Sequence, residues 1–149
     1  MKKLYRTLDQ MFEYSDLANL DVAGYVKMLA ECRVNLLNPL ALGFVAGHAY
    51  WPSNVAPRHP LLKGRDFFGE LVSECGRFDI EVLPCAVFRD LSPEMAQAHP
   101  DYCARFEDGS IPYSVNNNDI AGFWQPRYFV CSNSPGHREY VRAVIHELF

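Results

Sequence analysis

The chain has 149 residues, 49% of them hydrophobic and 13% aromatic, so it can bury one core, and nothing suggests a second domain. Its net charge of -4 disfavours the clustered basic surface that nucleic-acid binding needs. No apolar run long enough for a signal peptide or a membrane span begins at the N-terminus. We therefore expect a cytoplasmic protein with no nucleic-acid or membrane partner.

Cysteine usage gives no support for a metal or disulfide framework. The five cysteines are widely spaced and form no C-x-x-C pair, which disfavours both a disulfide scaffold and a zinc knuckle. No G-x-G-x-x-G or G-x-x-x-x-G-K motif is present either. We expect neither a metal nor a cofactor.

The first half of the chain predicts two strands that flank a helix. Residues 4–9 form a short alternating run of β-forming residues, and this run ends in an acidic residue. Asp21 is the expected N-cap of a helix with apolar residues three and four apart, running to about Arg33. A buried strand at 34–37 follows at once, and Asn38-Pro39 should end it.

A long loop and a third strand come next. Residues 39–65 show neither helical nor strand periodicity and are dense in Gly, Pro, aromatic and His residues. A helix capped by Asp66 then leads to a strand at 80–88, which should be buried on both faces except at Glu81. Pro84 lacks a ladder donor, so we expect a bulge or the strand's end near it.

The remaining residues form a second long excursion and a final helix. Residues 89–133 contain a short helix predicted near 93–99 and a turn at Glu107-Asp108-Gly109. Ser134 and Pro135 then begin a helix that continues to the C-terminal residues.

This alternation of strands and helices predicts an α/β fold with a parallel sheet, either doubly wound or a barrel. Both long loops follow strands, as in (β/α)-barrels, where such loops build the active site. A barrel has about eight units, so we predict a partial (β/α)8 TIM-type barrel of about the first three βα units. Residues 1–149 would be the N-terminal portion of one catalytic domain, truncated before strand four. The remainder of the barrel or self-association would cover the exposed apolar surface.

A series of short motifs extends from about Asp21 to the C-terminus. They are GHAYWPS at 47–53, HPLLKGRD at 59–66, HPDY at 99–102, the Asp-Gly turn at 108–109, CSNSP at 131–135 and REY at 138–140. In this order they resemble a family of hypothetical glycosyl hydrolases related to α-L-fucosidases. The resemblance implies a (β/α)8 barrel that hydrolyses glycosidic bonds, with its catalytic carboxylates on strand four and later, beyond Phe149. We therefore expect a glycoside hydrolase segment that supplies substrate-side loops, lacks the nucleophile and is inactive alone.

The loop after the second strand carries three candidate sugar-binding residues, His48, Tyr50 and Trp51. Aromatic faces stack on the apolar C–H surface of a sugar, and an imidazole can hydrogen-bond a hydroxyl group. Pockets combine apolar walls with a few polar groups in this way. Tyr50 and Trp51 could equally serve only to hold the loop against the barrel. His59 is better explained by loop packing.

Three further candidates lie elsewhere in the chain. Arg89 follows the third strand directly, where its guanidinium could hold a substrate or a catalytic carboxylate, or form a salt bridge. Asp9 lies at the end of the predicted first strand, where it could be either a substrate-binding residue or a turn residue. Trp124 could form one wall of the cleft. Asp66 and Glu70 lie one helical turn apart, but a cap and an exposed helix face explain them better than a catalytic pair.

Two alternatives to a hydrolase segment remain open. One is a noncatalytic carbohydrate-binding barrel relative, and the other is an unrelated small α/β protein. An acidic residue at the end of the next strand would favour the enzyme, and cooperative unfolding of the 149-residue monomer would favour the small protein. The sugar-cleft hypothesis requires residues 39–65 and 89–133 to open at the same end of the sheet.

Overall fold

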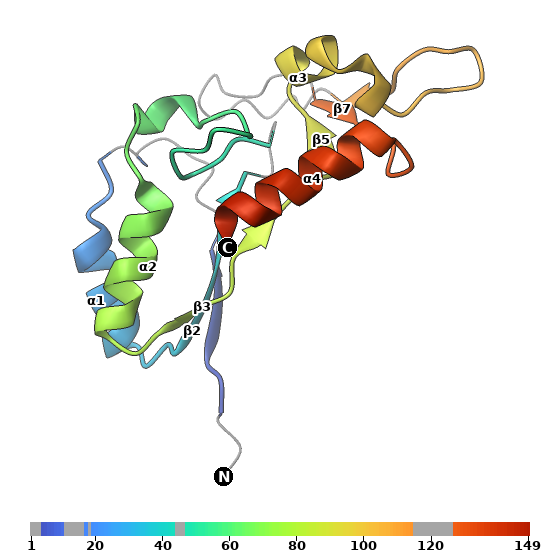
Figure 1. Cartoon of the computed structure of the whole chain (residues 1–149). Coiled ribbons are helices and arrows are strands. Elements are labelled where there is room, and N and C mark those ends of the chain that lie inside the picture. The colour runs from blue at the N-terminus through green and yellow to red at the C-terminus, as the bar shows by residue number, and fades with distance from the viewer. Residues whose placement is uncertain (1–3, 11–16, 18, 44–46, 115–126) are drawn as a thin grey trace.

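The computed structural model describes residues 4–10, 17, 19–43, 47–114 and 127–149 (Figure 1). Its main sheet is parallel and consists of β1 (Thr7–Gln10), β2 (Leu36–Leu42), β3 (Glu81–Val82) and β4 (Cys85–Ala86). The strands follow the order β1-β2-β3, and β4 continues along β2 after β3. The predicted α/β fold with a parallel sheet is confirmed.

In the part of the chain that the structure describes, side-chain caps begin four α-helices, α1 (Val22–Glu31), α2 (Phe67–Arg77), α3 (Pro93–Ala98) and α4 (Pro135–Leu148). Asp21, Asp66 and Ser134 accept hydrogen bonds from the backbone N–H groups that a helix leaves unpaired, so the three caps expected from the sequence are confirmed. Ser92 caps α3 in the same way. The described residues also include two short 3-10 helices, at Pro60–Leu62 and Pro100–Tyr102.

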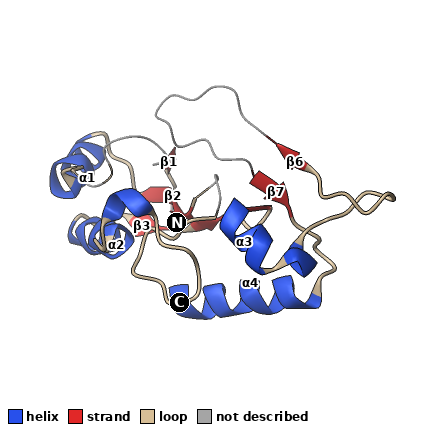
Figure 2. Cartoon of the chain, turned by 90° about the horizontal axis from the view of Figure 1, so that it is seen from above, coloured by secondary structure: helices blue, strands red, loops and turns tan. Residues whose placement is uncertain are grey.

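Both helices that connect the parallel strands lie on the same face of the main sheet. Because strand order follows chain order, right-handed crossovers place α1 and α2 together, and Figures 1 and 2 show them side by side. The Tyr25 hydroxyl of α1 donates to Gln10 at 3.0 Å, so Gln10 faces these helices. Strand alternation then puts Asp9 and its register partner Asn38 on the opposite face.

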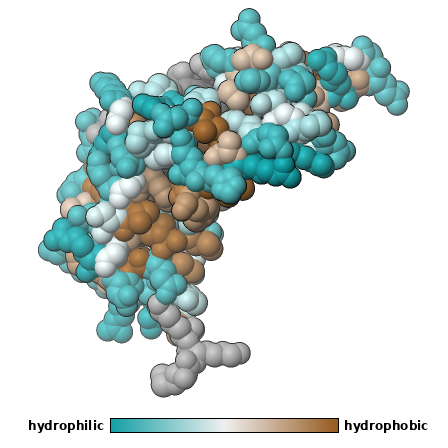
Figure 3. Space-filling model, viewed as in Figure 1, coloured by the Kyte–Doolittle hydropathy of each residue, from teal (hydrophilic) through white to brown (hydrophobic). Residues whose placement is uncertain are grey.

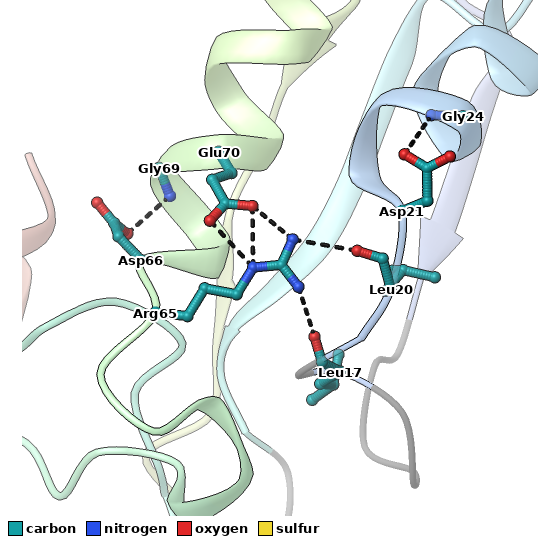
Figure 4. A network of polar contacts seen from close by, with 8 residues as sticks. All are labelled: Leu17, Leu20, Asp21, Gly24, Arg65, Asp66, Gly69 and Glu70. Carbon is teal, nitrogen blue, oxygen red and sulfur yellow. Dashed lines mark hydrogen bonds and ion pairs between the residues drawn. The ribbon is translucent and has the colours of Figure 1, made fainter.

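An ion-pair network joins the segments that lead into α1 and α2 (Figure 4). The Arg65 Nε donates to both carboxylate oxygens of Glu70, at 3.0 and 2.9 Å. Its other nitrogens donate to the backbone carbonyls of Leu17 and Leu20, at 3.0 and 3.1 Å. This pairing raises the pKa of Arg65 and lowers that of Glu70. The structural interpretation of Asp66 and Glu70 is confirmed, since Asp66 is a cap and Glu70 an ion-pair partner.

The prediction that Asn38-Pro39 ends the second strand is wrong, because β2 continues to Leu42. The backbone carbonyls of Asn35 and Leu37 accept hydrogen bonds from Glu81 and Leu83, which lie on the β3 side of β2. Because backbone groups alternate along a strand, the backbone nitrogen of Pro39, two residues further, also points to the β3 side. There the ladder is interrupted between β3 and β4. A proline costs little at a position where no ladder donor is needed.

The third strand is broken at Pro84 into β3 and β4, and the register along β2 shifts between Leu40 and Leu42, which confirms the expected irregularity. The expectation of burial on both faces is wrong, since Leu83 is 54% exposed. Within the described ranges, β3 and β4 pair with β2 alone, so they form an open edge of the sheet.

The second excursion (residues 89–133) is more structured than the sequence suggests. It contains an antiparallel sheet of β5 (Asp90–Leu91), β7 (Arg127–Phe129) and β6 (Tyr113–Ser114), in that order, and the predicted short helix, which is α3. Its small core is formed by Leu91, Ala96 and Cys103. Gly109 has a φ of 82°, as the predicted turn requires.

Apolar side chains remain exposed beside the open edge. Figure 3 shows them gathered over α2, β3 and the end of α4. A hollow of about 460 Å³ lies there, lined mainly by Phe68, Val72, Val82, Pro84, Leu148 and Phe149. Val72 is 42% exposed and Phe149 86%. In the part of the chain that the structure describes, no helix combines the length and apolar character needed to cross a bilayer.

Candidate functional site

The two long connections leave the same end of the main sheet. Both follow strands that pair in parallel with each other, β2 and β4, so both begin at the carboxyl ends of the strands, here called the C-terminal rim. They also approach each other, because a Cβ built on Gly47 would lie 3.5 Å from the carbonyl oxygen of Asp90. His48 and Arg89, which are adjacent in sequence to these two residues, therefore lie at one rim.

The β2 loop (residues 47–65) is held by its backbone and by buried rings. Ala49 forms isolated bridges with Leu42 and Arg58, and Tyr50 donates from its backbone N–H to Ala41. The Tyr50 side chain is 1% exposed and packs edge-on against Phe67, with ring centroids 6.3 Å apart. In this chain Tyr50 is a core residue, as the loop-holding alternative expects.

Two histidines of the β2 loop lie near each other. The His48 and His59 ring centroids are 5.8 Å apart, and His59 also packs edge-on against Tyr50 at 5.2 Å. His59 is buried, whereas His48 is only partly buried. Burial, with a smaller effect from His48, lowers the pKa of His59 to about 4. His59 is thus neutral at physiological pH, and His48 is the loop histidine that solvent can reach.

Trp51 is fixed by a carboxylate from α4. Its indole Nε1 donates to Glu147 at 3.1 Å, and the same carboxylate accepts from the Ser53 hydroxyl and from the Asn54 backbone N–H at 2.6 Å. Burial alone would raise the pKa of Glu147, but these hydrogen bonds outweigh it and lower the pKa. Only 9% of Trp51 is exposed, so its ring belongs to the main core and supports the β2 loop from its buried side.

The second excursion begins with a buried charge. The Asp90 side chain is 1% exposed and lies between two guanidinium groups. The Arg89 Nη2 is 3.1 Å from Asp90 Oδ2, and the Arg127 Nη1 is 3.3 Å from the same oxygen. The salt-bridge alternative for Arg89 is therefore confirmed, and because its side chain is 53% exposed, its role toward a substrate stays a prediction.

The six predicted sugar-binding residues are not all brought together. His48 and Arg89 both lie at the C-terminal rim, next to the point where Gly47 approaches Asp90, while Tyr50 and Trp51 are buried beneath the same loop. Asp9 is exposed on the face opposite α1 and α2. Trp124 lies outside the described residues.

Sequence reasoning missed Asp90, Arg127 and Glu147. The position of Asp90, directly after Arg89 at a strand end, was a usable signal. Arg127 and Glu147 gave none, because they reach the site through contacts with residues 37 and 96 positions away. Among the described side chains, no group of three His, Cys, Asp or Glu residues is arranged to hold a metal ion.

Comparison with known families decides the relationship. Residues 21–149 match the family described as Hypothetical glycosyl hydrolase 6. The chain belongs to this family. The resemblance inferred from the motifs is confirmed, and no curated protein matches the sequence.

Solved structures share the fold of this chain over part of their length. The α-L-fucosidase isoenzyme 2 from Paenibacillus thiaminolyticus aligns with a TM-score of 0.67 and 23% identity, over 97% of this chain and 21% of that one. The maltogenic α-amylase AmyB from Thermotoga neapolitana gives a TM-score of 0.62 and 13% identity, over 94% of this chain and 35% of that one. An α-amylase from Lactobacillus plantarum gives a TM-score of 0.58 and 15% identity, over 95% of this chain and 35% of that one. This chain thus spans about a fifth to a third of these proteins, and such low identities show the fold alone.

Proposed function

We propose that this chain forms the first three βα units of a (β/α)8 barrel and contributes substrate-side loops to the hydrolysis of a glycosidic bond. Membership of a glycosyl hydrolase family supports the reaction class. The consecutive strand order, with α1 and α2 on one face, supports a barrel, because a doubly wound sheet places helices on both faces. In this proposal the catalytic carboxylates come from units outside this chain.

The observation that carries the proposal is the approach of Gly47 to Asp90. It places a partly buried histidine and a half-exposed arginine at the end of the sheet where barrel enzymes bind substrates. We propose that His48 and Arg89 hydrogen-bond sugar hydroxyl groups, while Tyr50 and Trp51 hold the loop that presents His48. Asp9 and Trp124 complete the proposed sugar-binding set, Asp9 from the face of β1 that α1 and α2 leave uncovered.

The open edge and the apolar hollow support a barrel that continues. In the described structure β3 and β4 pair with no strand other than β2, and Leu83 between them is exposed. Exposed apolar patches of this kind mark surfaces that another segment or molecule covers. We propose that further βα units, or a second copy in their absence, cover this surface.

The test is an activity assay on the protein as its complete reading frame encodes it. A panel of chromogenic α-L-fucosides, α-glucosides and N-acetylgalactosaminides would be supplied to that protein and to residues 1–149 alone. We expect the complete protein to hydrolyse at least one substrate and residues 1–149 to hydrolyse none. His48→Ala and Arg89→Ala should each lower kcat/KM at least about tenfold, equivalent to about 1.4 kcal/mol, while His146→Ala on exposed α4 should not.

A noncatalytic sugar-binding role is the second candidate. The rim carboxylate of Asp90 agrees with it, because this group is buried and engaged by two arginines, so the rim can contact a sugar without Asp90 acting on the glycosidic bond. Binding of a sugar by the complete protein without hydrolysis of any glycoside in the panel would support this alternative and contradict the hydrolase proposal.

A further inference from the structure

A carboxylate without solvent contact is a costly feature at the start of the second excursion. The Asp90 side chain is 1% exposed, and removal of a charge from water is favourable only when partners compensate it closely. The pairing of β5 with β7 does not require a carboxylate, because Asp90 is paired with Phe129 through the strand backbone. Burial of this charge therefore calls for an explanation beyond the sheet itself.

The contacts of Asp90 fix one guanidinium in particular. Arg89 Nε lies 3.3 Å from each carboxylate oxygen, and its Nη2 lies 3.1 Å from Oδ2. Such two-pronged contact fixes the plane of a guanidinium as well as its position. The Arg89 backbone is held too, since its carbonyl accepts from the Val130 N–H at 3.1 Å. Arg89 is nevertheless 53% exposed, so the group that Asp90 holds faces outward.

Arg127 contacts the same carboxylate. Its Nη1 is 3.3 Å from Asp90 Oδ2, and its side chain is 15% exposed. Arg127 comes from β7, the strand paired with β5, so the orientation of Asp90 is set by the small sheet and not by solvent. Arg127 of the small sheet thus anchors the same carboxylate that contacts Arg89.

We propose that Asp90 is a positioning residue that holds the Arg89 guanidinium at the C-terminal rim, beside the β2 loop, in the orientation in which it contacts sugar hydroxyl groups. This inference rests on the proposed function. Pre-organisation of a long side chain matters for binding because an unrestrained arginine must lose its conformational freedom when the ligand arrives. A rigid guanidinium plane also selects between hydroxyl arrangements, so Asp90 contributes to the choice of sugar through Arg89.

The experiment is a double-mutant cycle on the complete protein, with methyl α-L-fucoside and maltose as the ligands. Dissociation constants are measured for the parent, Asp90→Asn, Arg89→Ala and the double variant. We expect each single variant to bind about tenfold more weakly and the double variant to bind no more weakly than Arg89→Ala. Glu139→Gln is the matched control, because Glu139 pairs with Arg142 on the exposed face of α4 and should leave binding unchanged.

Two additional measurements separate positioning from folding. Arg89→Lys keeps the charge on a half-exposed side chain but loses the planar fork, so it should fold and still bind about tenfold more weakly. The arginine Nε–H signals in ¹⁵N NMR report the Asp90 contact without any sugar, and Asp90→Asn should speed the exchange of the Arg89 signal with solvent. The melting temperature of each variant shows whether weaker sugar binding results from unfolding of that variant.

The outcomes decide the inference separately from the proposed function. Additive losses in the cycle, or full binding by Arg89→Lys, would overturn the positioning role. If the parent binds neither sugar, the sugar-binding proposal fails for these ligands, and the NMR signal decides whether Asp90 holds Arg89. An unchanged Arg89 signal in Asp90→Asn would overturn the inference whatever the sugar result.

Discussion

The two connections that meet at the C-terminal rim are held in different ways. The β2 loop inserts Ala49, Tyr50, Trp51 and Leu62 into the main core, so apolar burial fixes it, with added hydrogen bonds to Glu147 of α4. The second excursion builds a separate small core and its own antiparallel sheet, and it meets the β2 loop through the ion-paired residue Asp90.

This difference shows how a rim can combine a rigid base with polar side chains. Apolar burial fixes the base of the β2 loop and leaves His48 partly open to solvent. The charged cluster of the second excursion places a guanidinium outward in a fixed orientation. The two regions should therefore respond differently to cavities, to pH and to small changes in packing.

The largest expected effect comes from a cavity under the β2 loop. Tyr50→Ala removes a ring that is 1% exposed, and loss of such an aromatic group costs about 3–5 kcal/mol of unfolding free energy. The matched change in the second excursion is Tyr113→Ala on β6. Because Tyr113 is 61% exposed, its replacement should lower the unfolding free energy by about 0.5 kcal/mol or less. Urea denaturation measures both, and equal losses would break the proposed contrast.

Acid should weaken the β2 loop through His59. Burial, and then His48, lowers the pKa of His59 to about 4 in the folded protein, against 6.5 as its ordinary value. Between these values the unfolded chain binds more protons, so stability falls as the pH drops from 6.5 toward 4 and then levels off. The loss is on the order of 3 kcal/mol.

A difference profile isolates this effect, because burial also lowers the pKa of His137 in α4 and acts in the same direction. His59→Gln should flatten the fall in unfolding free energy between pH 6.5 and 4, and the exposed His146→Gln should not. A profile of His59→Gln that parallels that of the parent would refute the assignment.

Most of the local structure could be predicted from the sequence, because it depends on neighbouring residues. The caps at Asp21, Asp66 and Ser134 and the apolar stripes of their helices were readable, since capping and periodicity act within one or two turns. The continuation of β2 through Pro39 was not readable. It depends on where the partner strand breaks, which lies more than forty residues away.

The site was partly predictable for the same reason. His48 and Arg89 could be placed at one rim because parallel strands share their carboxyl ends. The burial of Tyr50 and Trp51 and the pairing of Asp90 with Arg127 depend on long-range contacts. β5 and β6 have two residues each and β7 has three, too few to show any periodicity.

A smaller effect is expected where α4 holds the β2 loop. Glu147→Gln weakens hydrogen bonds from Trp51, Ser53 and Asn54, and we expect a loss of about 1–2 kcal/mol at neutral pH. Because these contacts lower the pKa of Glu147, its contribution is present above its ordinary pKa of 4.5 and is lost as the pH falls through the lower folded value. Glu139→Gln on the same helix should change the unfolding free energy by less than about 0.5 kcal/mol, and a similar loss there would show that the loop contacts are not responsible.

The smallest expected effect compares two helix glycines, Gly136 of α4, which lies against Tyr102 of the second excursion, and Gly76 of α2, which has no close neighbour. A Cβ at Gly136 of α4 would lie 2.6 Å from the Tyr102 ring, so Gly136→Ala should lower the unfolding free energy by about 1 kcal/mol. Gly76 of α2 has no atom within 4 Å of such a Cβ, so Gly76→Ala should raise the unfolding free energy by about 0.5–1 kcal/mol through helix propensity. Thermal unfolding measures both, and a stabilised Gly136→Ala would contradict the close packing of Tyr102 on α4.

The most direct test of a shared sugar site is the crystal structure of the complete protein soaked with whichever methyl glycoside it binds. We predict that the sugar lies at the C-terminal rim, with hydroxyl groups within hydrogen-bonding distance of both His48 and Arg89. A sugar bound elsewhere, in contact with neither side chain, would contradict the proposal that the β2 loop and the second excursion build one site.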